Sequence, residues 1–195
     1  TKRKLRGKQI REKYNLENQI VVLHAGTFHQ HKGIDVLIKA VQSLNRDDVK
    51  LVLIGNGNME KYNKLAGSET IFIGQIPLEK IPDYVDACDI YAIPTGDTLY
   101  ARAEIPAKIF EAMMLGKAIV ATRLSDIPII LNNGECGILA KPNDVKSFAN
   151  ALEKLIEDNE LRKKIGHKAK KRYFKNYSYK QIEKKITKVY SQVSL

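Results

Sequence analysis

The stretch QIVVLHAGTFHQHKGIDVLIKAVQSL (19–44) decides the fold. Its beginning, 19–26, is apolar and β-branched and ends in glycine, which is typical of a short, buried strand. After a polar loop, apolar side chains recur at positions 0, 3, 4, 7 and 10 counted from Ile34, so they share one face of a helix. A buried strand followed by a one-sided helix is the building unit of a parallel α/β sheet.

The same unit recurs along the chain. Further strands are predicted at 49–55, 70–74, 89–94, 117–122 and 136–140. Helices are predicted at 34–44, 58–66, 78–87, 106–115, 145–156, 159–175 and 179–193. Because the strands are apolar throughout and alternate with helices, we predict an α/β fold. It is a Rossmann-like, doubly wound parallel sheet of about six strands with helices on both faces.

Ligands bind such sheets at the carboxyl ends of the strands, where the strand order reverses. The candidate binding loops are therefore 26–33, 55–58, 74–77, 94–106 and 122–126.

The composition fits one globular domain with an uneven charge. The chain has 195 residues, of which 44% are hydrophobic and 28% charged, and a net charge of +11. Residues 2–11 hold six basic and no acidic side chains, 160–188 hold twelve basic and two acidic ones, and the interior has a net charge of −5. We predict that the basic ends are solvated helix faces that anionic lipid headgroups can attract. Few aromatic residues alternate with the basic ones, so we do not expect nucleic acid as a partner. No apolar run is long enough to predict a membrane span.

The two cysteines, Cys88 and Cys136, stand among small or apolar neighbours. This favours buried thiols in a reducing cytoplasm over a disulfide. Neither the cysteines nor the histidine pair His29 and His31 has the partners typical of a metal site, so no metal is expected. The alternative role for the two histidines is to line a polar cleft.

The loop AGTFHQHKG (25–33) is the first candidate for phosphate binding. Gly26 allows a tight turn, and Gly33 allows close approach of the backbone. Lys32 stands where a helix begins, and backbone N–H groups there already favour an anion. The alternative is a solvent-exposed lysine in an ordinary turn. The loop matches neither a Walker A loop nor the dinucleotide-binding glycine pattern.

The loop IGNGN (54–58) carries Gly55 and Gly57 after a buried strand. Two glycines there are compatible with close approach to a nucleotide and equally with a simple turn.

The segment ARAEIPAKIFEAMMLGKAIVAT (101–122) contains the second group of candidates. Pro106 is expected in the first turn of a helix, where its missing N–H does no harm. Lys108 and Glu111 lie three residues apart, off the apolar face. They can form a surface ion pair, or Lys108 can face phosphate while Glu111 accepts hydrogen bonds from ribose hydroxyls.

Taken in order, these motifs resemble the C-terminal domain of family 4 glycosyltransferases, which have the GT-B fold. The resemblance covers nearly the whole chain. It rests on the segments AGTFHQHKG, LVLIGNG, IFIGQIP, CDIYAIPT, KIFEAMMLGKAIVAT, GECGILAKPND and SYKQIEKKITKVY. It implies a nucleotide-sugar-binding domain over 1–178 and a C-terminal helix over 179–195 that crosses back toward an N-terminal acceptor-binding domain.

The resemblance also assigns residues to the donor site. Lys32 and Glu104 are the implied catalytic residues. The implied donor-binding residues are Gly26, Thr27, Lys32, Gly55, Gly57, Ile76, Pro106, Lys108, Ile109 and Glu111. Two departures from the family pattern stand out. Thr27 replaces a diphosphate-binding arginine, for which Lys108 or Arg102 is expected to compensate. Glu104 lies one position later than the family's first glutamate, which puts its sugar contact in question.

The implied activity is transfer of a hexose-type sugar from a nucleotide diphosphate to a glycan or lipid-linked acceptor, with retention at the anomeric carbon. The resemblance implies polysaccharide biosynthesis in the cytoplasm or at the inner face of the cell membrane, without a metal or other cofactor. UDP, GDP and ADP remain open as the nucleotide. Residues 1–18 are too short for an acceptor domain, so we expect an excised domain or a subunit of a split enzyme that transfers little sugar alone. The alternatives are a non-catalytic nucleotide-binding module that regulates a partner glycosyltransferase, and a GT-B nucleotide-sugar epimerase.

Overall fold

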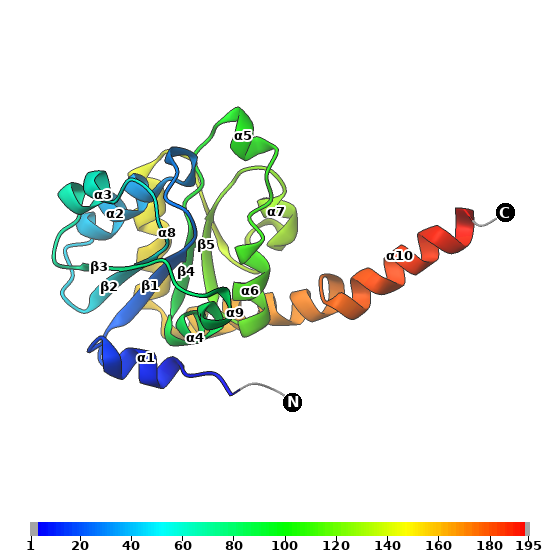
Figure 1. The fold of residues 1–195 in the computed structure, drawn as a ribbon, viewed down its shortest axis with the longest axis horizontal. Coiled ribbons are helices and arrows are strands. Elements are labelled where there is room, and N and C mark those ends of the chain that lie inside the picture. Colours follow the sequence, from blue (N-terminus) through cyan, green and yellow to red (C-terminus); the bar gives the residue numbers. More distant parts are fainter. Residues whose placement is uncertain (1–3, 194–195) are drawn as a thin grey trace.

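The computed structural model describes residues 4–193 and contains one six-stranded parallel sheet. The strand order is β3-β2-β1-β4-β5-β6, and every neighbouring pair is parallel (Figure 1). The strands are β1 (Ile20–Ala25), β2 (Val49–Ile54), β3 (Thr70–Gly74), β4 (Ile90–Ile93), β5 (Ala118–Thr122) and β6 (Ile138–Ala140). The predicted fold class and all six predicted strands are confirmed.

Ten α-helices lie within the described residues, together with three short 3₁₀ segments. The α-helices are α1 (Gly7–Lys13), α2 (Ile34–Ser43), α3 (Met59–Leu65), α4 (Ile81–Ala87), α5 (Leu99–Arg102), α6 (Lys108–Leu115), α7 (Ile127–Ile130), α8 (Val145–Glu157), α9 (Asn159–Asn176) and α10 (Tyr179–Val193). The 3₁₀ segments are η1 (Gln30–Lys32), η2 (Leu78–Lys80) and η3 (Asn132–Gly134).

Two of the helix predictions need correction. The helix expected at 78–87 is divided into η2 and α4, and α6 begins at Lys108, so Pro106 precedes this helix instead of standing in its first turn. The four-residue helices α5 and α7 lie in segments for which we predicted no helix, because one turn is too short to display a helical period.

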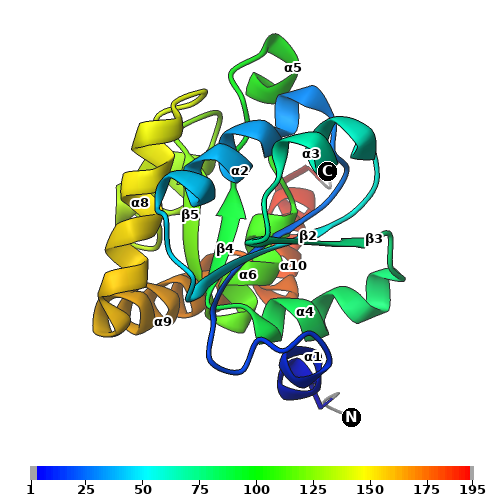
Figure 2. The ribbon, with the colours of Figure 1, turned by 90° about the vertical axis from the view of Figure 1, so that its left-hand side faces the viewer.

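The helices cover both faces of the sheet. Figure 2 shows α2 and α8 on one side of the strands and α4 and α6 on the other. A hydrophobic core lies on each face of the sheet, and alternate residues of β1 point into one or the other. Val22 belongs to the same core as Leu37 of α2, and Leu23 to the same core as Val85 of α4 and Met113 of α6. Burial on both faces is the reason why the strands are apolar throughout.

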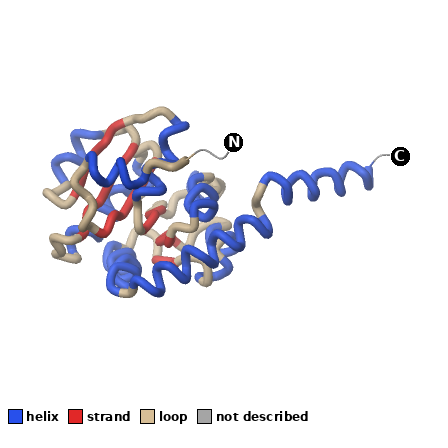
Figure 3. The backbone as a smooth tube through the Cα atoms, turned by 90° about the horizontal axis from the view of Figure 1, so that it is seen from below, coloured by secondary structure: helices blue, strands red, loops and turns tan. Residues whose placement is uncertain are grey.

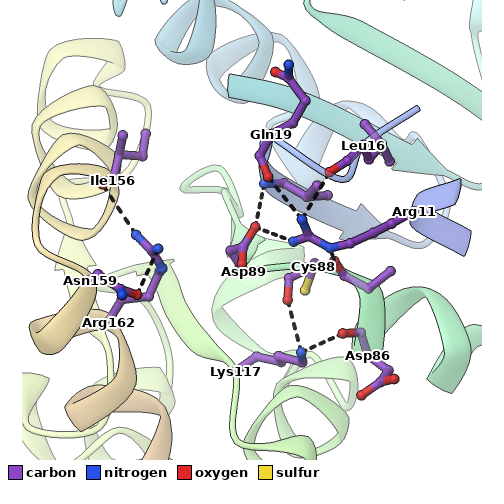
Figure 4. Close-up of polar contacts among 12 residues, drawn as sticks. Arg11, Leu16, Gln19, Asp86, Cys88, Asp89, Lys117, Ile156, Asn159 and Arg162 are labelled. Carbon is purple, nitrogen blue, oxygen red and sulfur yellow. Dashed lines mark hydrogen bonds and ion pairs between the residues drawn. The ribbon is translucent and has the colours of Figure 1, made fainter. Parts of the chain in front are cut away.

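Helix α1 is fixed to the domain by a half-buried arginine. The guanidinium of Arg11 donates to the carbonyl oxygens of Leu16, Gln19 and Ala87 and pairs with Asp89 (Figure 4). The Asp89 carboxylate also accepts from the N–H of Val21, so this contact ties α1 to the beginning of β1.

We had expected both basic ends to be solvated, but some of their arginines are partly buried and hydrogen-bonded. Besides Arg11, Arg162 donates to the carbonyl oxygens of Leu155 and Ile156, and Arg172 donates to the carbonyl oxygen of Ile130. Arginine offers five donors in a rigid fork and satisfies carbonyl oxygens at the ends of neighbouring elements. Most lysines of the C-terminal helices do lie exposed, as predicted.

Helix α10 leaves the domain as a separate arm (Figures 1 and 3). Its apolar side chains are largely exposed: Tyr179 is 81% exposed and Val189 is 59% exposed. The predicted helix is thus present, while its last two residues, and residues 1–3 at the other end, lie outside the described part of the chain. Within residues 4–193, every helix is too short or too polar to cross a bilayer. Cys88 and Cys136 are both free and buried, which confirms the prediction of thiols.

Candidate functional site

The loops after β1 and β4 meet at the point where the strand order reverses. From β1 the chain continues to β2 on one side, whereas from β4 it continues to β5 on the other. The two loops touch: the N–H of Gly96 donates to the carbonyl oxygen of His31 at 2.8 Å, and a Cβ on Gly33 would overlap the carbonyl oxygen of Pro94. Doubly wound sheets bind their ligands in the crevice between such diverging loops.

Lys32 and Glu104 form an ion pair across this crevice. Lys32 ends η1, and its Nζ lies 2.6 and 2.7 Å from the two carboxylate oxygens of Glu104. The Lys32 side chain is 11% exposed, which excludes the expected alternative of a lysine in a solvated turn. The hydrogen bond from Lys32 holds the pKa of the Glu104 carboxyl below its usual value, although burial opposes this shift.

Lys108 brings a second ammonium group to the same crevice. It is the first residue of α6, and its Nζ fills the space in which a Cβ on Gly26 would lie. Burial and the charge of Lys32 lower the pKa of Lys108 to about 8, while Glu104 and Glu111 oppose the shift. Glycine is favoured at position 26 by its φ of 148°, and the flexible end of Lys108 occupies the space that this glycine leaves open.

Glu111 lies one turn further along α6 and is half-buried. Burial raises the pKa of its carboxyl, and the positive charge of Lys108 partly offsets this effect. Among the ion pairs of the described residues none joins Lys108 to Glu111, because the lysine extends toward Gly26. The surface ion pair that we kept as an alternative is therefore wrong.

Gly55 and Gly57 serve the packing of one loop against another. Their φ angles of 146° and 148° are in the region that favours glycine, and a Cβ on Gly55 would overlap the carbonyl oxygen of Gly26. A Cβ on Gly57 would lie 2.8 Å from Cβ of Phe28. Both glycines thus allow this loop to pack against the loop after β1, and their close approach to a nucleotide stays a prediction.

The other predicted residues are distributed around the crevice. Thr27 is exposed beside Gly26, Ile76 is half-buried in the loop after β3, and Pro106 is buried just before α6. The side chain of Ile109 is completely buried in the core, and its N–H donates to the carbonyl oxygen of Pro106 at 2.9 Å. Ile109 therefore contributes to the site only by anchoring α6.

Arg102 does not reach the two lysines of the crevice. It pairs instead with Asp97 on the exposed loop after β4, with Nε 2.6 Å from a carboxylate oxygen. Of the two residues expected to compensate for Thr27, only Lys108 lies in the crevice.

The histidine pair lies at the edge of the crevice. The rings of His29 and His31 are stacked with centroids 5.8 Å apart, and His31 also packs on Tyr100. His31 and Tyr100 line a groove of 640 Å³ beside the ion pair. Among the described residues no group of three or more histidine, cysteine or acidic side chains is arranged to hold a metal ion.

One residue of the site, His24, was not predicted from the sequence. It lies in β1, two residues before Gly26, and only 1% of it is exposed. Its Nδ1 is 2.9 Å from the carbonyl oxygen of Ala92 in β4, whereas its Nε2 is buried without a hydrogen-bond partner. A histidine inside an otherwise apolar strand is the signal that could have identified it.

Comparison with known proteins shows the family to which this chain belongs. The sequence model of the family described as "Glycosyl transferases group 1" matches residues 7–172, and the chain belongs to this family. An uncharacterized glycosyltransferase of Methanocaldococcus jannaschii is 31% identical over 194 residues, which are 95% of this chain and 48% of that protein. A D-inositol 3-phosphate glycosyltransferase of Corynebacterium diphtheriae is 28% identical over 90% of this chain and 43% of its own length. The chain thus spans about half the length of the curated relatives it matches.

Solved structures show the same fold. HepE of Anabaena, crystallised in complex with UDP, superimposes with a TM-score of 0.87 and 22% identity over 95% of this chain and 52% of its own. The C-terminal domain of a group 1 glycosyl transferase of Francisella tularensis has a TM-score of 0.76 and 24% identity, covering 91% of this chain and 95% of that domain. The resemblance to the C-terminal half of a GT-B glycosyltransferase is confirmed.

Proposed function

We propose that this chain is the donor-binding domain of a retaining glycosyltransferase that transfers a hexose-type sugar from a nucleotide diphosphate to a glycan or lipid-linked acceptor. One observation supports the proposal most directly: where the strand order reverses, the Lys108 ammonium lies over Gly26, Lys32 pairs with Glu104, and the two lysine charges act on each other. Like charges repel each other, and Glu104 pairs directly only with Lys32, so a further anion would stabilise the two lysines together.

The anion in this proposal is the donor diphosphate. Lys32 and Lys108 neutralise it together, and Lys108 replaces the arginine that the family pattern places at Thr27. The N-terminus of α6 adds backbone N–H groups and a favourable dipole. UDP is the first nucleotide to test, because HepE was crystallised with UDP and with UDP-glucose.

Glu111 accepts hydrogen bonds from the ribose hydroxyls. Its half-buried carboxyl is acted on by the charge of Lys108, and a vicinal diol supplies two donors to one carboxylate. Glu104 changes partner when the diphosphate takes Lys32, and it then faces the sugar.

The reaction breaks the bond between the anomeric carbon and the diphosphate oxygen. The acceptor oxygen forms the new bond on the same face, and the acceptor proton passes to the leaving diphosphate. Negative charge grows on the diphosphate as this bond breaks, and the two lysines stabilise it. Removing one such donor typically costs about two orders of magnitude in rate, which is the loss expected for Lys32→Met in the complete enzyme.

The acceptor is held by a further domain, toward which the apolar face of α10 projects. The basic face of α9 contributes a peripheral contact with anionic lipid at the inner face of the cell membrane. This face consists of four exposed lysines at helical spacing: Lys164, Lys168, Lys171 and Lys175.

Calorimetric titration with UDP, GDP and ADP tests the proposal. We expect one nucleotide to bind, and we expect Glu111→Ala and Lys32→Met each to weaken it about tenfold or more, the loss of a hydrogen bond to a charged group. Lys154→Met, which removes an exposed lysine of α8, is the matched control and should bind as wild type. If none of the three nucleotides binds, the proposed function is wrong; if Glu111→Ala binds normally, the ribose assignment is wrong.

A further inference from the structure

A buried acceptor without a partner lies directly beneath the donor crevice. The ring of His24 is 1% exposed, and its Nε2 has no hydrogen-bond partner. An unpaired buried polar atom destabilises the folded state, so such atoms are rare in folded proteins and call for an explanation.

The other ring nitrogen determines the chemical state of Nε2. Nδ1 lies 2.9 Å from the carbonyl oxygen of Ala92, and a carbonyl oxygen can only accept, so Nδ1 carries the proton. Burial, followed by the nearby charge of Lys108, lowers the pKa of His24 well below its usual value. The imidazole is therefore neutral, and Nε2 presents a lone pair.

This lone pair faces the gap left by the missing side chain of Gly26. Nε2 lies 3.8 Å from the position of a Cβ on Gly26, and the Nζ and Cε atoms of Lys108 reach into the same gap. A lysine ammonium has three N–H donors on a flexible stem, so a small rotation directs one of them to Nε2. The other charged groups that act on Lys108 are Lys32, Glu104 and Glu111.

We infer that His24 is a positioning residue for the donor site: its Nε2 accepts a hydrogen bond from the Lys108 ammonium and directs the remaining N–H groups of Lys108 toward the donor diphosphate. His24 does not touch the donor in this arrangement. His24 accepts a hydrogen bond from the Lys108 ammonium. Because its imidazole is neutral, it leaves the positive charge of Lys108 available to the diphosphate. The inference rests on the proposed function of Lys108 as a diphosphate ligand.

Two substitutions separate the two ring nitrogens. Asparagine places a polar atom where Nδ1 is and can keep the bond to Ala92, whereas glutamine is long enough to keep an acceptor at the position of Nε2. We expect His24→Asn to bind UDP at least fivefold more weakly, and His24→Gln to stay within about twofold of wild type. A purely structural role in joining β1 to β4 predicts the opposite order, because only asparagine retains the interstrand bond.

The pKa of Lys108 provides a second readout that needs no nucleotide. In the nucleotide-free chain, NMR titration of the Lys108 ammonium should give similar pKa values in wild type and His24→Gln and a pKa about one unit lower in His24→Asn, because a buried cation that loses an acceptor is less stable. Should His24→Asn fail to fold, His24→Met replaces it, since methionine matches glutamine in length and offers only a weak acceptor.

The inference is overturned if the Lys108 pKa is the same in the variants with and without the acceptor, or if His24→Gln loses as much UDP affinity as His24→Asn. Failure of wild type to bind any nucleotide would instead refute the proposed function and leave the pKa comparison intact as a test of the histidine–lysine contact.

Discussion

Replacing Lys108 by methionine should make the protein more stable and at the same time impair donor binding. The pKa of Lys108 falls from 10.5 to about 8 on folding, chiefly because of burial. Each pKa unit corresponds to about 1.4 kcal/mol, so the buried ammonium destabilises the folded state by up to about 3 kcal/mol at pH 7. Methionine has a similar length and no charge, so Lys108→Met removes this cost.

The pH dependence gives this prediction a definite sign. Because the folded-state pKa is lower than the unfolded one, the destabilisation is complete below about pH 8 and disappears as the pH rises to about 10.5. Lys108→Met should therefore melt several degrees above wild type at pH 7, at about 2–4 °C per kcal/mol for a chain of this size. The difference should shrink at pH 9.5.

The assay combines thermal unfolding at both pH values with calorimetric titration of UDP, for which we expect at least a tenfold loss of affinity. Lys117→Met is the matched control. The Nζ of Lys117 donates to the carbonyl oxygens of Asp86 and Cys88 at 2.7 and 3.0 Å (Figure 4), so its loss should destabilise the fold by about 1–3 kcal/mol and leave UDP binding unchanged. A Lys108→Met variant that is less stable than wild type at pH 7, or that binds UDP normally, would refute the reasoning.

Two further variants test the other charges. Glu104→Gln should bind UDP several-fold more tightly in calorimetry. The Glu104 carboxylate lies 2.6 Å from the Lys32 ammonium and competes with the diphosphate for it, and a neutral amide competes less. Weaker binding would mean that Glu104 contacts the nucleotide directly. Changing the four α9 lysines together to glutamine should abolish sedimentation with phosphatidylserine vesicles, since each contributes about 1 kcal/mol near an anionic surface. Lys154→Gln is the control, and vesicle binding that survives the fourfold change would contradict a lipid contact through α9.

The strands and most of the helices of this fold could be predicted from the sequence. Segments such as 19–26 and 49–55 must be strands because they are apolar, short and bounded by glycine, and α2 follows from the spacing of its buried side chains. The helices α5 and α7 were not predicted, because one turn is too short to show a helical period. Arg11 was predicted to be solvated, whereas it hydrogen-bonds to the domain.

The site loops also followed from the sequence, since glycines and a lysine stand at the ends of buried strands. What the sequence by itself determined was therefore the succession of strands and helices and the family. Only the tertiary structure decided that Lys32 meets Glu104, that Lys108 fills the space above Gly26 and that His24 has a free lone pair beneath it. The reason is physical: Lys32 and Glu104 lie 72 positions apart along the chain and Gly26 and Lys108 lie 82 apart, so strand order and burial, not local spacing, bring them together.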